Sequence, residues 1–483
     1  MMRVHHPTLN NIFLIKSLIL TLIFFPATFV FGQDALDELM NSHGIPESKL
    51  SIILEDIESN TRLIEINPKR SRSPGSVTKI FTAFSALDVL GKDFQWKTEA
   101  YIEQKAKNKK KIDRLLIKGG GDPSFSIDDL EDLIKTIRSK GIEEISDGLY
   151  FDLSFFKQRK KSTGSFDQNP LRPYNSMHSA LIVNSNRLDL IFSFSPEKKK
   201  VDVSPFFLPD GVIIQNNLSI GTGNCSDFRS QVTFREQYRK KLLTIVVEGE
   251  YPSRCVEKNH DLAITKTEHY FFGAFKKLWV DSGGKINGYF KKHNKNSKDI
   301  LIAQILSDDL SSAVRLMLKE SDNLTARNIF LSLGYELNRK EFRPMRRLSY
   351  ESMKKNNIHW HYRNFIENGS GLSRKTKIKP ESVISLIGKI DEDDRFSEIE
   401  SMLPVSGIDG TLKNIYRSET LRGQMRLKTG TLNGVRCLAG FITSKTGKKY
   451  RFVFMHNNYD EYDYSLRLFT TELLEKIVKD EIS

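Results

Sequence analysis

The segment P-G-S-V-T-K at residues 74–79 places a serine and a lysine three positions apart, directly before an apolar stretch. Apolar residues then recur at the spacing of a helix with one buried face: Ile80, Phe81, Phe84 and Leu87. Because proline and glycine interrupt the preceding structure, we expect Ser76 in or just before the first helical turn, with Lys79 on the same face. An N-cap serine followed by a surface lysine would give the same pattern, so the pair needs further context.

The Ser-x-x-Lys pattern occurs five times, and only the neighbouring sequence distinguishes its copies. The other four begin at Ser154, Ser195, Ser282 and Ser352. The first three lead into polar, proline-containing or glycine-rich sequence. The fourth is followed by K-K-N-N at residues 354–357, which is typical of solvated surface. Ser76 and Lys79 are therefore the pair that opens a buried helix.

Two further motifs follow in the second half of the chain. S-D-N at residues 321–323 is the only Ser-x-Asn sequence, and it precedes a helical pattern at residues 324–337. Lys-Thr-Gly occurs at Lys428 and again at Lys445. The second copy lies between two apolar runs with polar flanks and predicts a hairpin turn. The first copy begins a strand, and only this copy is placed to line a cleft.

In this order the three motifs form the signature set of penicillin-binding proteins and class A β-lactamases. A serine hydroxyl is a weak nucleophile until a base takes its proton, and the chain contains neither G-x-S-x-G nor H-E-x-x-H. Lys79 can accept the proton of Ser76 only when its amine is neutral, which requires desolvation and a neighbouring positive charge. Lys428 supplies that charge.

The other motif residues complete a site for acyl transfer to serine. Ser321 would relay the proton to the leaving amine, and Asn323 would hold both the substrate amide and Lys79. The backbone N–H groups of Ser76 and Thr431 would form the oxyanion hole, whose donors stabilise the tetrahedral intermediate. We expect one strand segment to bind substrate: Lys428, Thr429, Gly430 and Thr431. Nucleophile, base and oxyanion donors are complete without a metal or cofactor, and neither is predicted.

The chain resembles the D-alanyl-D-alanine carboxypeptidase/endopeptidase family of low-molecular-mass, class C penicillin-binding proteins, peptidase family S13. Six segments carry the resemblance: PGSVTK (74–79), GGGDPSF (119–125), SDNLTARN (321–328), NGSGLSR (368–374), LPVSGIDGTL (403–412) and LKTGTLNGVRCLAGF (427–441). Ser321 follows Ser76 by 245 residues, a gap that this family fills with extra domains. The resemblance implies an α/β (α+β) serine penicillin-binding/β-lactamase-like transpeptidase fold.

The resemblance also implies a reaction and its partners. These are hydrolysis of the terminal D-Ala-D-Ala bond of peptidoglycan stem peptides, or of the D-Ala to diamino-acid cross-link, through an acyl-enzyme on Ser76. β-Lactam antibiotics would acylate the same serine. The chain departs from the family at Asn368, where aspartate is common, and at Thr431, where serine is common and the hydroxyl is kept. Asn328 and Arg374 are candidates for supporting the site from outside it.

The length of the chain and the changes in its sequence pattern predict more than one domain. With 483 residues, 39% of them hydrophobic and 28% charged, the protein is globular and too long for one core. We expect a signal peptide at residues 1–32, a penicillin-binding catalytic domain at 33–97 and 264–483, and a β-rich insertion of one or two small subdomains at 98–263. Strands are expected at 49–56, 61–67, 435–443 and 450–456, and helices at 127–140, 267–281, 310–337 and 463–480.

The N-terminus has the form of a secretory signal. It holds Arg3 and Lys16, no acidic residue, and an apolar run at residues 18–31, with a cut expected before Gln33. An uncleaved membrane anchor is the alternative, although the run is shorter than the roughly 20 apolar residues of a spanning helix. We therefore expect export across the inner membrane to the periplasm or cell envelope.

The formal charge of +14 falls to +12 when the two cations of the signal are removed, so the mature protein is strongly basic. Its cations form clusters such as A-K-N-K-K-K at residues 106–111. Clusters of this kind are typical of solvated loops, and an anionic cell envelope is the partner that they would attract. An exported protein meets no nucleic acid.

The three cysteines, Cys225, Cys255 and Cys437, lack the spacing of metal ligands. Outside the cytoplasm the first two could form a disulfide, but two buried thiols would have the same sequence pattern. Cys437 lies in an apolar run and is expected in a core.

Two other functions fit parts of the pattern. A β-lactamase would also be acylated on its serine, but it needs a deacylating glutamate and has no use for the long insertion. A non-catalytic envelope-binding protein could keep the fold, but it would not need a full set of reactive residues. This chain has all five: Ser76, Lys79, Ser321, Asn323 and Lys428.

Overall fold

The computed structural model describes residues 33–156, 164–334, 342–458 and 464–481. One unit, here called the core unit, is built on a five-stranded antiparallel sheet with the order β17-β18-β19-β1-β2. Its strands are β1 (Leu50–Asp56), β2 (Arg62–Ile66), β17 (Met425–Leu432), β18 (Val435–Thr443) and β19 (Lys449–Asn457). The predicted strands are confirmed, and the second Lys-Thr-Gly copy lies in the turn between β18 and β19.

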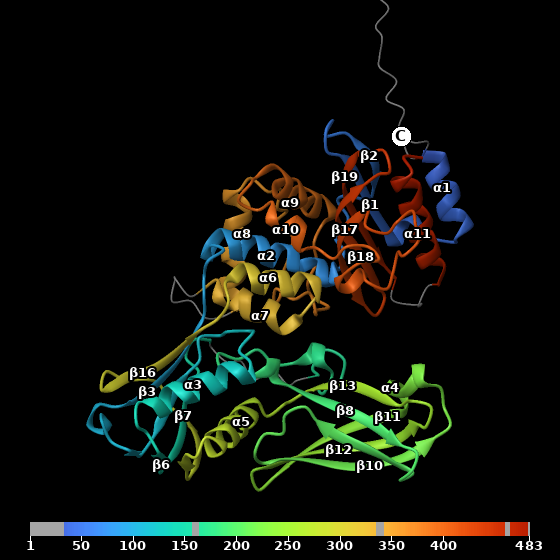
Figure 1. Ribbon diagram of the computed structural model, residues 1–483. Helices are drawn as coiled ribbons and strands as arrows, with labels where there is room; N and C mark the ends of the chain where they lie inside the picture. Colours follow the sequence, from blue (N-terminus) through green and yellow to red (C-terminus); the bar gives the residue numbers. More distant parts are fainter. Residues whose placement is uncertain (1–32, 157–163, 335–341, 459–463, 482–483) are drawn as a thin grey trace, which may run out of the picture.

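Helices cover both faces of this sheet (Figure 1). One face packs against α1 (Gln33–Ser42) and α11 (Tyr464–Val478), which share an apolar cluster with the strands. The helices of the other layer are α2 (Thr78–Leu90), α6 (Leu310–Lys319), α7 (Asn323–Ser332), α8 (Phe342–Lys355), α9 (Pro380–Glu392) and α10 (Glu398–Met402). In α2, residues 78–87 are buried without interruption, so this helix lies inside the layer. The predicted opening of a buried helix is confirmed.

The helical periodicity at residues 310–337 corresponds to two helices, with a break between them that was not predicted. α6 ends at Lys319, α7 begins at Asn323, and Ser321 between them has a φ of 58°. Apolar residues continue on both sides of the break, so the periodicity does not reveal it. The left-handed backbone at Ser321 costs free energy in a residue with a Cβ and places this serine at a corner. Residues 335–337 lie outside the described residues.

A second unit, here called the inserted part, is built on a sheet with the order β15-β7-β5-β3-β16. Its elements are β3 (Lys97–Glu103), β4 (Lys111–Ile112), β5 (Leu115–Lys118), α3 (Ile127–Ser139), β6 (Glu144–Ile145), β7 (Gly148–Asp152), α5 (Thr267–Asp281), β14 (Lys285–Ile286), β15 (Tyr289–Lys292) and β16 (Asp299–Leu306). The predicted helices at 127–140 and 267–281 are confirmed. The expected boundary at residue 263 does not coincide with the strand pairing, because β15 and β16 belong to this sheet and β14 to a smaller sheet with the order β14-β6-β4.

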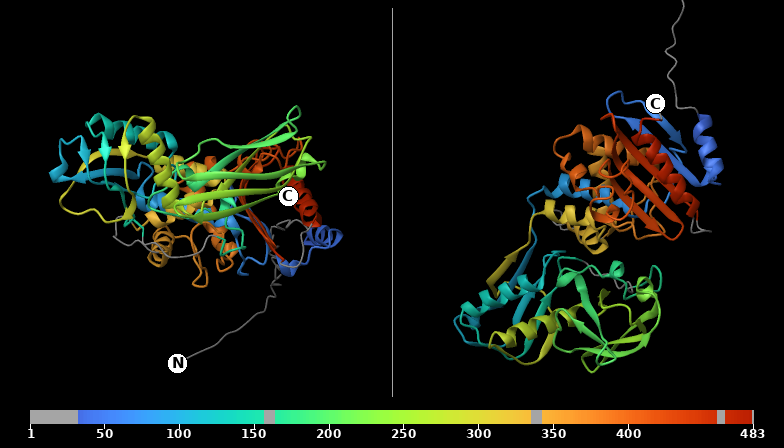
Figure 2. Two further views of the ribbon diagram at one scale, coloured as in Figure 1. Left: turned by 90° about the horizontal axis from the view of Figure 1, so that it is seen from below. Right: turned by 45° about the vertical axis from the view of Figure 1, so that its right-hand side comes forward.

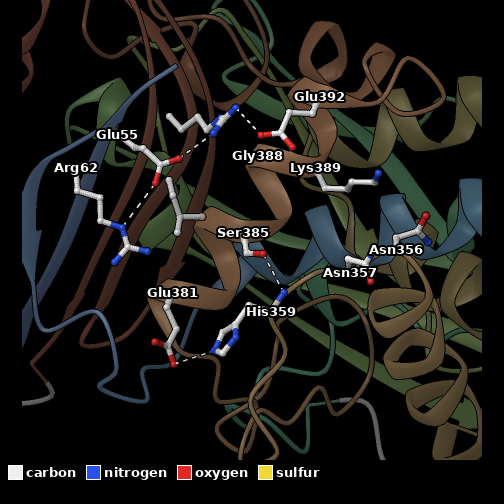
Figure 3. A pocket seen from close by; sticks show the side chains of 12 residues that line it. Glu55, Arg62, Asn356, Asn357, His359, Glu381, Ser385, Gly388, Lys389 and Glu392 are labelled. Carbon is white, nitrogen blue, oxygen red and sulfur yellow. Dashed lines mark hydrogen bonds and ion pairs between the residues drawn. The ribbon is translucent and has the colours of Figure 1, made fainter. Parts of the chain in front are cut away.

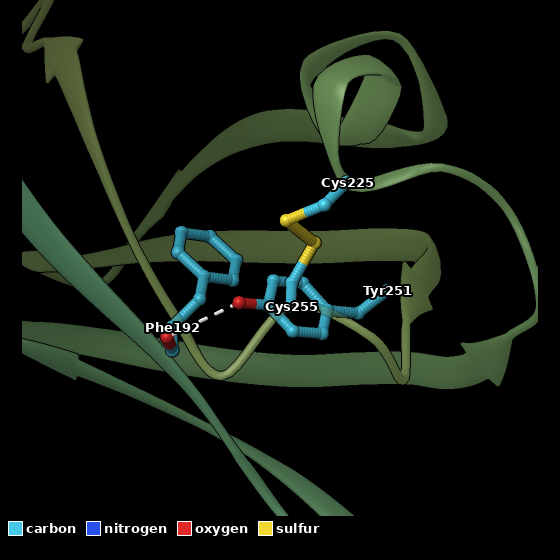
Figure 4. The surroundings of a disulfide bond; sticks show 4 residues. All are labelled: Phe192, Cys225, Tyr251 and Cys255. Carbon is cyan, nitrogen blue, oxygen red and sulfur yellow. Dashed lines mark hydrogen bonds between the residues drawn. A yellow bond between two sulfur atoms is a disulfide. The ribbon is translucent and has the colours of Figure 1, made fainter.

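The remainder of the inserted part is a pair of three-stranded sheets, β13-β8-β9 and β10-β12-β11. Their elements are β8 (Arg187–Ser195), β9 (Lys200–Pro205), β10 (Val212–Gly221), α4 (Phe228–Gln231), β11 (Val232–Arg239), β12 (Leu242–Pro252) and β13 (Glu257–Ala263). A disulfide joins Cys225 to Cys255, beside Tyr251, whose hydroxyl donates to the carbonyl of Phe192 (Figure 4). Of the two alternatives for these cysteines, the structure has the disulfide. Cys437 is free and buried in β18, as expected.

The views of Figures 1 and 2 show the inserted part as a separate body that the chain enters through β3 and leaves through β16. These two strands are antiparallel neighbours, with Lys97 paired to Leu306. The predicted signal peptide, residues 1–32, lies outside the described residues. Within the described ranges, no helix combines the length and apolar character needed to cross a bilayer.

Candidate active site

Ser76 and Lys79 meet at the start of α2. Ser76 lies in a single 3-10 turn, Gly75–Val77, and Lys79 lies in the first turn of the helix. The N-cap residue is Val77, and Lys79 is completely buried, so the alternative of a capping serine with a surface lysine is wrong. The Lys79 Nζ and Ser76 Oγ are 2.9 Å apart. Burial, aided by the charge of Lys428, holds the pKa of Lys79 well below its usual value and favours the neutral amine.

Two acceptors fix the orientation of the Lys79 amine. Its Nζ donates to Asn323 Oδ1 at 2.7 Å and to the carbonyl oxygen of Ser370 at 2.6 Å. A neutral amine has two N–H groups and one lone pair. Since both hydrogens are used by these acceptors, the lone pair is left for the third contact, the hydroxyl of Ser76. With a neutral amine, Ser76 would donate its hydroxyl proton to Lys79, which is the direction that nucleophile activation requires.

Lys428 and Ser321 form a second pair of motif residues in the site, beside Ser76 and Lys79. Lys428 is completely buried in β17, and its Nζ donates to Ser321 Oγ at 2.9 Å and to the carbonyl of Thr429 at 3.1 Å. Burial lowers the pKa of Lys428 to about 7. The left-handed corner between α6 and α7 brings Ser321 to this position.

Close backbone contact joins β17 to the turn that carries Ser76. A methyl group on Gly430 would lie 2.3 Å from the carbonyl oxygen of Pro74 and 3.2 Å from the amide nitrogen of Ser76. A methyl group on Gly75 would lie 3.2 Å from the amide nitrogen of Thr431. The backbone N–H groups of Ser76 and Thr431, predicted as oxyanion donors, therefore lie on either side of this backbone contact. Only a glycine at position 430 permits the contact.

The segment N-G-S-G-L at residues 368–372 closes the site from a third side. Gly371 has a φ of 80°, and a methyl group there would lie 1.9 Å from the carbonyl oxygen of Gly75. Asn368 accepts from the backbone N–H and the hydroxyl of Ser370 and donates to the carbonyl of Leu372. This explains how asparagine serves here, since an aspartate could accept the first two bonds but not donate the third.

The inserted part also reaches the site, through contacts that sequence reasoning did not find. Asn323 Nδ2 donates to the carbonyl of Tyr174 at 3.1 Å, and Arg327 Nη1 donates to the carbonyl of Ser176 at 3.0 Å. Asn328, predicted as a supporting residue, is buried and donates to the carbonyl of Gly121 at 2.9 Å. Helix α7 is thus held against the inserted part along its length.

Asp322, the middle residue of S-D-N, has a structural role that was not predicted. It caps α7 by accepting from the Thr325 amide at 2.7 Å, and it forms an ion pair with Arg187 of β8. Burial alone raises the pKa of Asp322, but Arg187 and the Thr325 amide hold it below its usual value. An aspartate directly before a helical pattern is a recognisable capping signal, whereas Arg187 had no such signal.

The last predicted supporting residue, Arg374, lies outside the reactive cluster. Its Nη1 donates to the carbonyl of Asn433 in the turn after β17, and its guanidinium stacks over the ring of Phe166. It therefore links the end of β17 to the inserted part. Among the residues that the structure describes, no three His, Cys, Asp or Glu side chains are grouped to hold a metal ion.

A pocket of about 580 Å³ in the core unit contains many charged side chains but none of the motif residues (Figure 3). Its charges pair with one another: Arg451 with Glu55 and Glu392, and His359 with Glu381. Because these groups already compensate each other, the pocket presents no single sign of charge to a ligand.

The sequence model of the D-Ala-D-Ala carboxypeptidase 3 (S13) family matches residues 32–468. The chain belongs to this family. The S13 relative DacB, a D-alanyl-D-alanine carboxypeptidase of Haemophilus influenzae, is 24% identical over 428 residues, which cover 87% of this chain and 88% of the relative. The D-alanyl-D-alanine carboxypeptidase of Actinomadura sp. is 23% identical over 431 residues, 86% of this chain and 79% of that protein.

Solved structures give the same result for the fold. The crystal structure of penicillin-binding protein 4 (dacB) from H. influenzae matches with a TM-score of 0.77 at 23% identity, covering 92% of this chain and 99% of that one. A structure of the H. influenzae protein complexed with a β-lactam matches with a TM-score of 0.72. The predicted family, fold class and reaction class are confirmed, and this S13 protein is a serine-type D-Ala-D-Ala carboxypeptidase.

Proposed function

We propose that Ser76 is the nucleophile of this carboxypeptidase and that Lys79 is its general base. The observation that carries the proposal is the position of the fully buried Lys79 amine beside Ser76 Oγ. In its neutral form, the two N–H groups of the amine are taken by Asn323 and Ser370. Only the lone pair of the neutral amine remains for Ser76 Oγ at 2.9 Å. A base that is already desolvated and oriented gives up little free energy to reorganisation during proton transfer.

The reaction follows from this geometry. Lys79 takes the hydroxyl proton while Ser76 Oγ bonds to the carbonyl carbon, and the backbone N–H groups of Ser76 and Thr431 stabilise the oxyanion. Ser321, bonded to Lys428, gives its hydroxyl proton to the amine nitrogen as the C–N bond breaks and receives in turn the proton that Lys79 took, so Lys79 is neutral again. A water molecule then attacks the ester carbonyl while Lys79 takes its proton, and Lys79 returns this proton to Ser76 Oγ as the C–O bond breaks and the stem peptide leaves.

The substrate-binding role falls to β17, the edge strand of the sheet. The cation of Lys428 and the hydroxyl of Thr429 bind the terminal carboxylate of the stem peptide, and Gly430 lets the backbone of β17 approach Ser76. The same site accepts the D-Ala to diamino-acid cross-link, because the leaving amine then belongs to a second stem. β-Lactams mimic the scissile amide and acylate Ser76.

We propose that the chain consists of a catalytic domain and an inserted accessory part, and that it acts in the periplasm, as the sequence indicates. The core unit is the catalytic domain, and the inserted part is an accessory unit. Residues 1–32 are a signal peptide that is removed on export to the periplasm. Weak attraction to the anionic envelope is assigned to the exposed cluster at residues 109–111, although Lys110 and Lys111 already pair with Glu143 and Glu144. Charge reversal of this cluster should weaken sedimentation with isolated sacculi and leave hydrolysis of a small peptide unchanged.

The decisive experiment for the nucleophile is covalent labelling by a fluorescent penicillin. The mature protein should be labelled and Ser76→Ala should not, because no ester can form without Oγ. Stable labelling of Ser76→Ala would refute the assignment. Rapid turnover of the drug without a lasting adduct would favour the β-lactamase alternative, and an unlabelled wild type would favour the non-catalytic one.

A further inference from the structure

A pocket of about 380 Å³ lies directly beside the substrate-binding strand. Its walls come from β17, β18, the segment 415–421 and α11. Successive side chains of a strand point to opposite faces. Lys428 therefore faces Ser321, whereas Thr429 and Thr431 face this pocket, and the hydroxyl of Thr429 lies 2.9 Å from that of Thr411. The pocket thus begins at Thr429, the residue next to Lys428.

The chemistry of the pocket is apolar at its base and basic at its rim. Buried Leu421, Leu438 and Phe454 line the base. The rim carries Arg417, Arg436 and Arg467, of which Arg436 already donates to the carbonyls of two neighbouring residues. Among the described residues that line the pocket, none is acidic. Such a site fits a ligand with short aliphatic arms and more than one carboxylate.

We propose that this pocket binds the leaving stem peptide of a cross-linked peptidoglycan dimer, an inference that rests on the function proposed above. When the carboxylate next to the scissile bond is held at Lys428 and Thr429, the rest of the leaving group extends beyond Thr429. A leaving D-alanine ends at that point. A leaving stem continues into the pocket, where the aliphatic arm of its diamino acid covers the apolar base and its terminal carboxylate meets the arginines of the rim.

The pocket therefore separates the two activities of the site. Arg417 and Arg467 are specificity-determining residues for the cross-linked substrate and have no role toward a single stem peptide. Both side chains lie on exposed residues, so their replacement does not disturb a core. Arg467 is also in the first turn of α11, where a glutamate is favoured by the helix dipole, which makes charge reversal there compatible with folding.

The experiment compares two soluble substrates with the purified mature protein: a pentapeptide ending in D-Ala-D-Ala and a cross-linked stem dimer without glycan. For Arg417→Glu combined with Arg467→Glu, we expect kcat/KM for the dimer to fall roughly 10-fold, mainly through KM, because two attractive charges become repulsive. The pentapeptide and penicillin acylation should change less than about 2-fold. Lys413→Glu is the matched control for each single variant, Arg417→Glu or Arg467→Glu, since it makes the same charge change on an exposed residue that does not line the pocket.

Inhibition by the released stem peptide gives a second readout, and the double variant should weaken it by a similar factor. The inference is overturned if the wild type does not cleave the dimer, if the double variant cleaves it normally, or if both substrates are affected equally. Lys413→Glu lowering kcat/KM for the dimer as much as either single variant would also overturn it, because the effect would then be one of net charge. Failure of the proposed function is a different result: Ser76→Ala would retain hydrolysis of the pentapeptide.

Discussion

Lys79 and Asn323, 244 positions apart in the chain, meet at 2.7 Å in the centre of the site. The direction of this bond is set from outside, because the amide nitrogen of Asn323 is used by the carbonyl of Tyr174 in the inserted part. Asn323 must therefore present its oxygen to Lys79 and accept a hydrogen. The inserted part thus helps to fix how the Lys79 amine is oriented toward Ser76.

The charge at position 323 should control the protonation of Lys79. In Asn323→Asp, an anion in contact with the amine stabilises the ammonium form and raises the pKa of Lys79. We expect penicillin acylation to fall about 10²–10⁴-fold at neutral pH, the range associated with loss of a general base, and to recover as the pH is raised. Asn323→Ala removes the bond without adding charge, so its loss should not depend on pH. Equal pH profiles for the two variants would contradict this account.

Arginine should separate the roles of the two lysines. Lys79→Arg should lose acylation about 10²–10⁴-fold or more, because a guanidinium cannot be deprotonated in a protein and cannot act as a base. Lys428→Arg should keep part of the activity, since a fixed cation for the substrate carboxylate is its proposed role. Rates of labelling by fluorescent penicillin measure both. Equal tolerance of arginine at the two positions would refute this division.

The pH dependence should have an alkaline limb that belongs to Lys428. Burial lowers the pKa of this amine to about 7, so its charge is present below pH 7 and lost above it. For a peptide ending in a carboxylate, kcat/KM should fall as the pH rises through about 7. The limb in kcat should lie higher, because a bound carboxylate stabilises the ammonium form. In Lys428→Arg the limb should disappear, and its persistence would assign it to another group.

Gly371 should be intolerant of any side chain. In Gly371→Ala, the new methyl group would meet the carbonyl of Gly75 at 1.9 Å in a left-handed conformation, so the segment must move and take the Ser370 carbonyl away from Lys79. We expect acylation to fall at least about 100-fold, the lower end for loss of a positioned base. Gly447→Ala is the control, because its φ of 93° is also left-handed but nothing lies within 4 Å. Similar losses in both variants would indicate general destabilisation instead.

The disulfide should stabilise the inserted part without affecting chemistry on small substrates. Cys225 and Cys255 are 30 positions apart, and closing a loop of that size constrains the unfolded chain by about 3–4 kcal/mol. The double variant Cys225→Ala with Cys255→Ala should therefore unfold at lower denaturant concentration while penicillin labelling of the folded protein is kept. Reductant should destabilise the wild type and leave the variant unchanged. A reductant effect on both proteins would place the stabilisation elsewhere.

That the motif residues meet in one candidate site could be predicted from the sequence, because each belongs to a short local pattern. Ser76 and Lys79 are adjacent on one helical turn, and the two Lys-Thr-Gly copies differ visibly in their flanks. Contacts made by backbone carbonyls could not be predicted, since the carbonyls of Tyr174 and Ser370 carry no information about residue type. Their partners are side chains far away in the chain.

The remaining differences from expectation have physical causes of the same kind. The corner at Ser321 is hidden because apolar periodicity continues from α6 into α7, and no glycine marks the left-handed residue. The boundary predicted at residue 263 differs from the strand pairing because α5 has the apolar periodicity of the core helices, although it packs against α3 in the inserted part. Strand pairing over long separations, as between β3 and β16, leaves no local signal.

The paired strands β3 and β16 also bear on the order in which the protein assembles. The chain carries Ser76 and Lys79 before the inserted part and Ser321, Asn323 and Lys428 after it. During synthesis or translocation, the first pair emerges long before its partners, as an exposed apolar helix with a lysine that water keeps charged. Only when β16 returns to β3, with Leu306 beside Lys97, is the rest of the chain delivered to α2. We expect the nascent protein to be chemically silent until that strand pair closes.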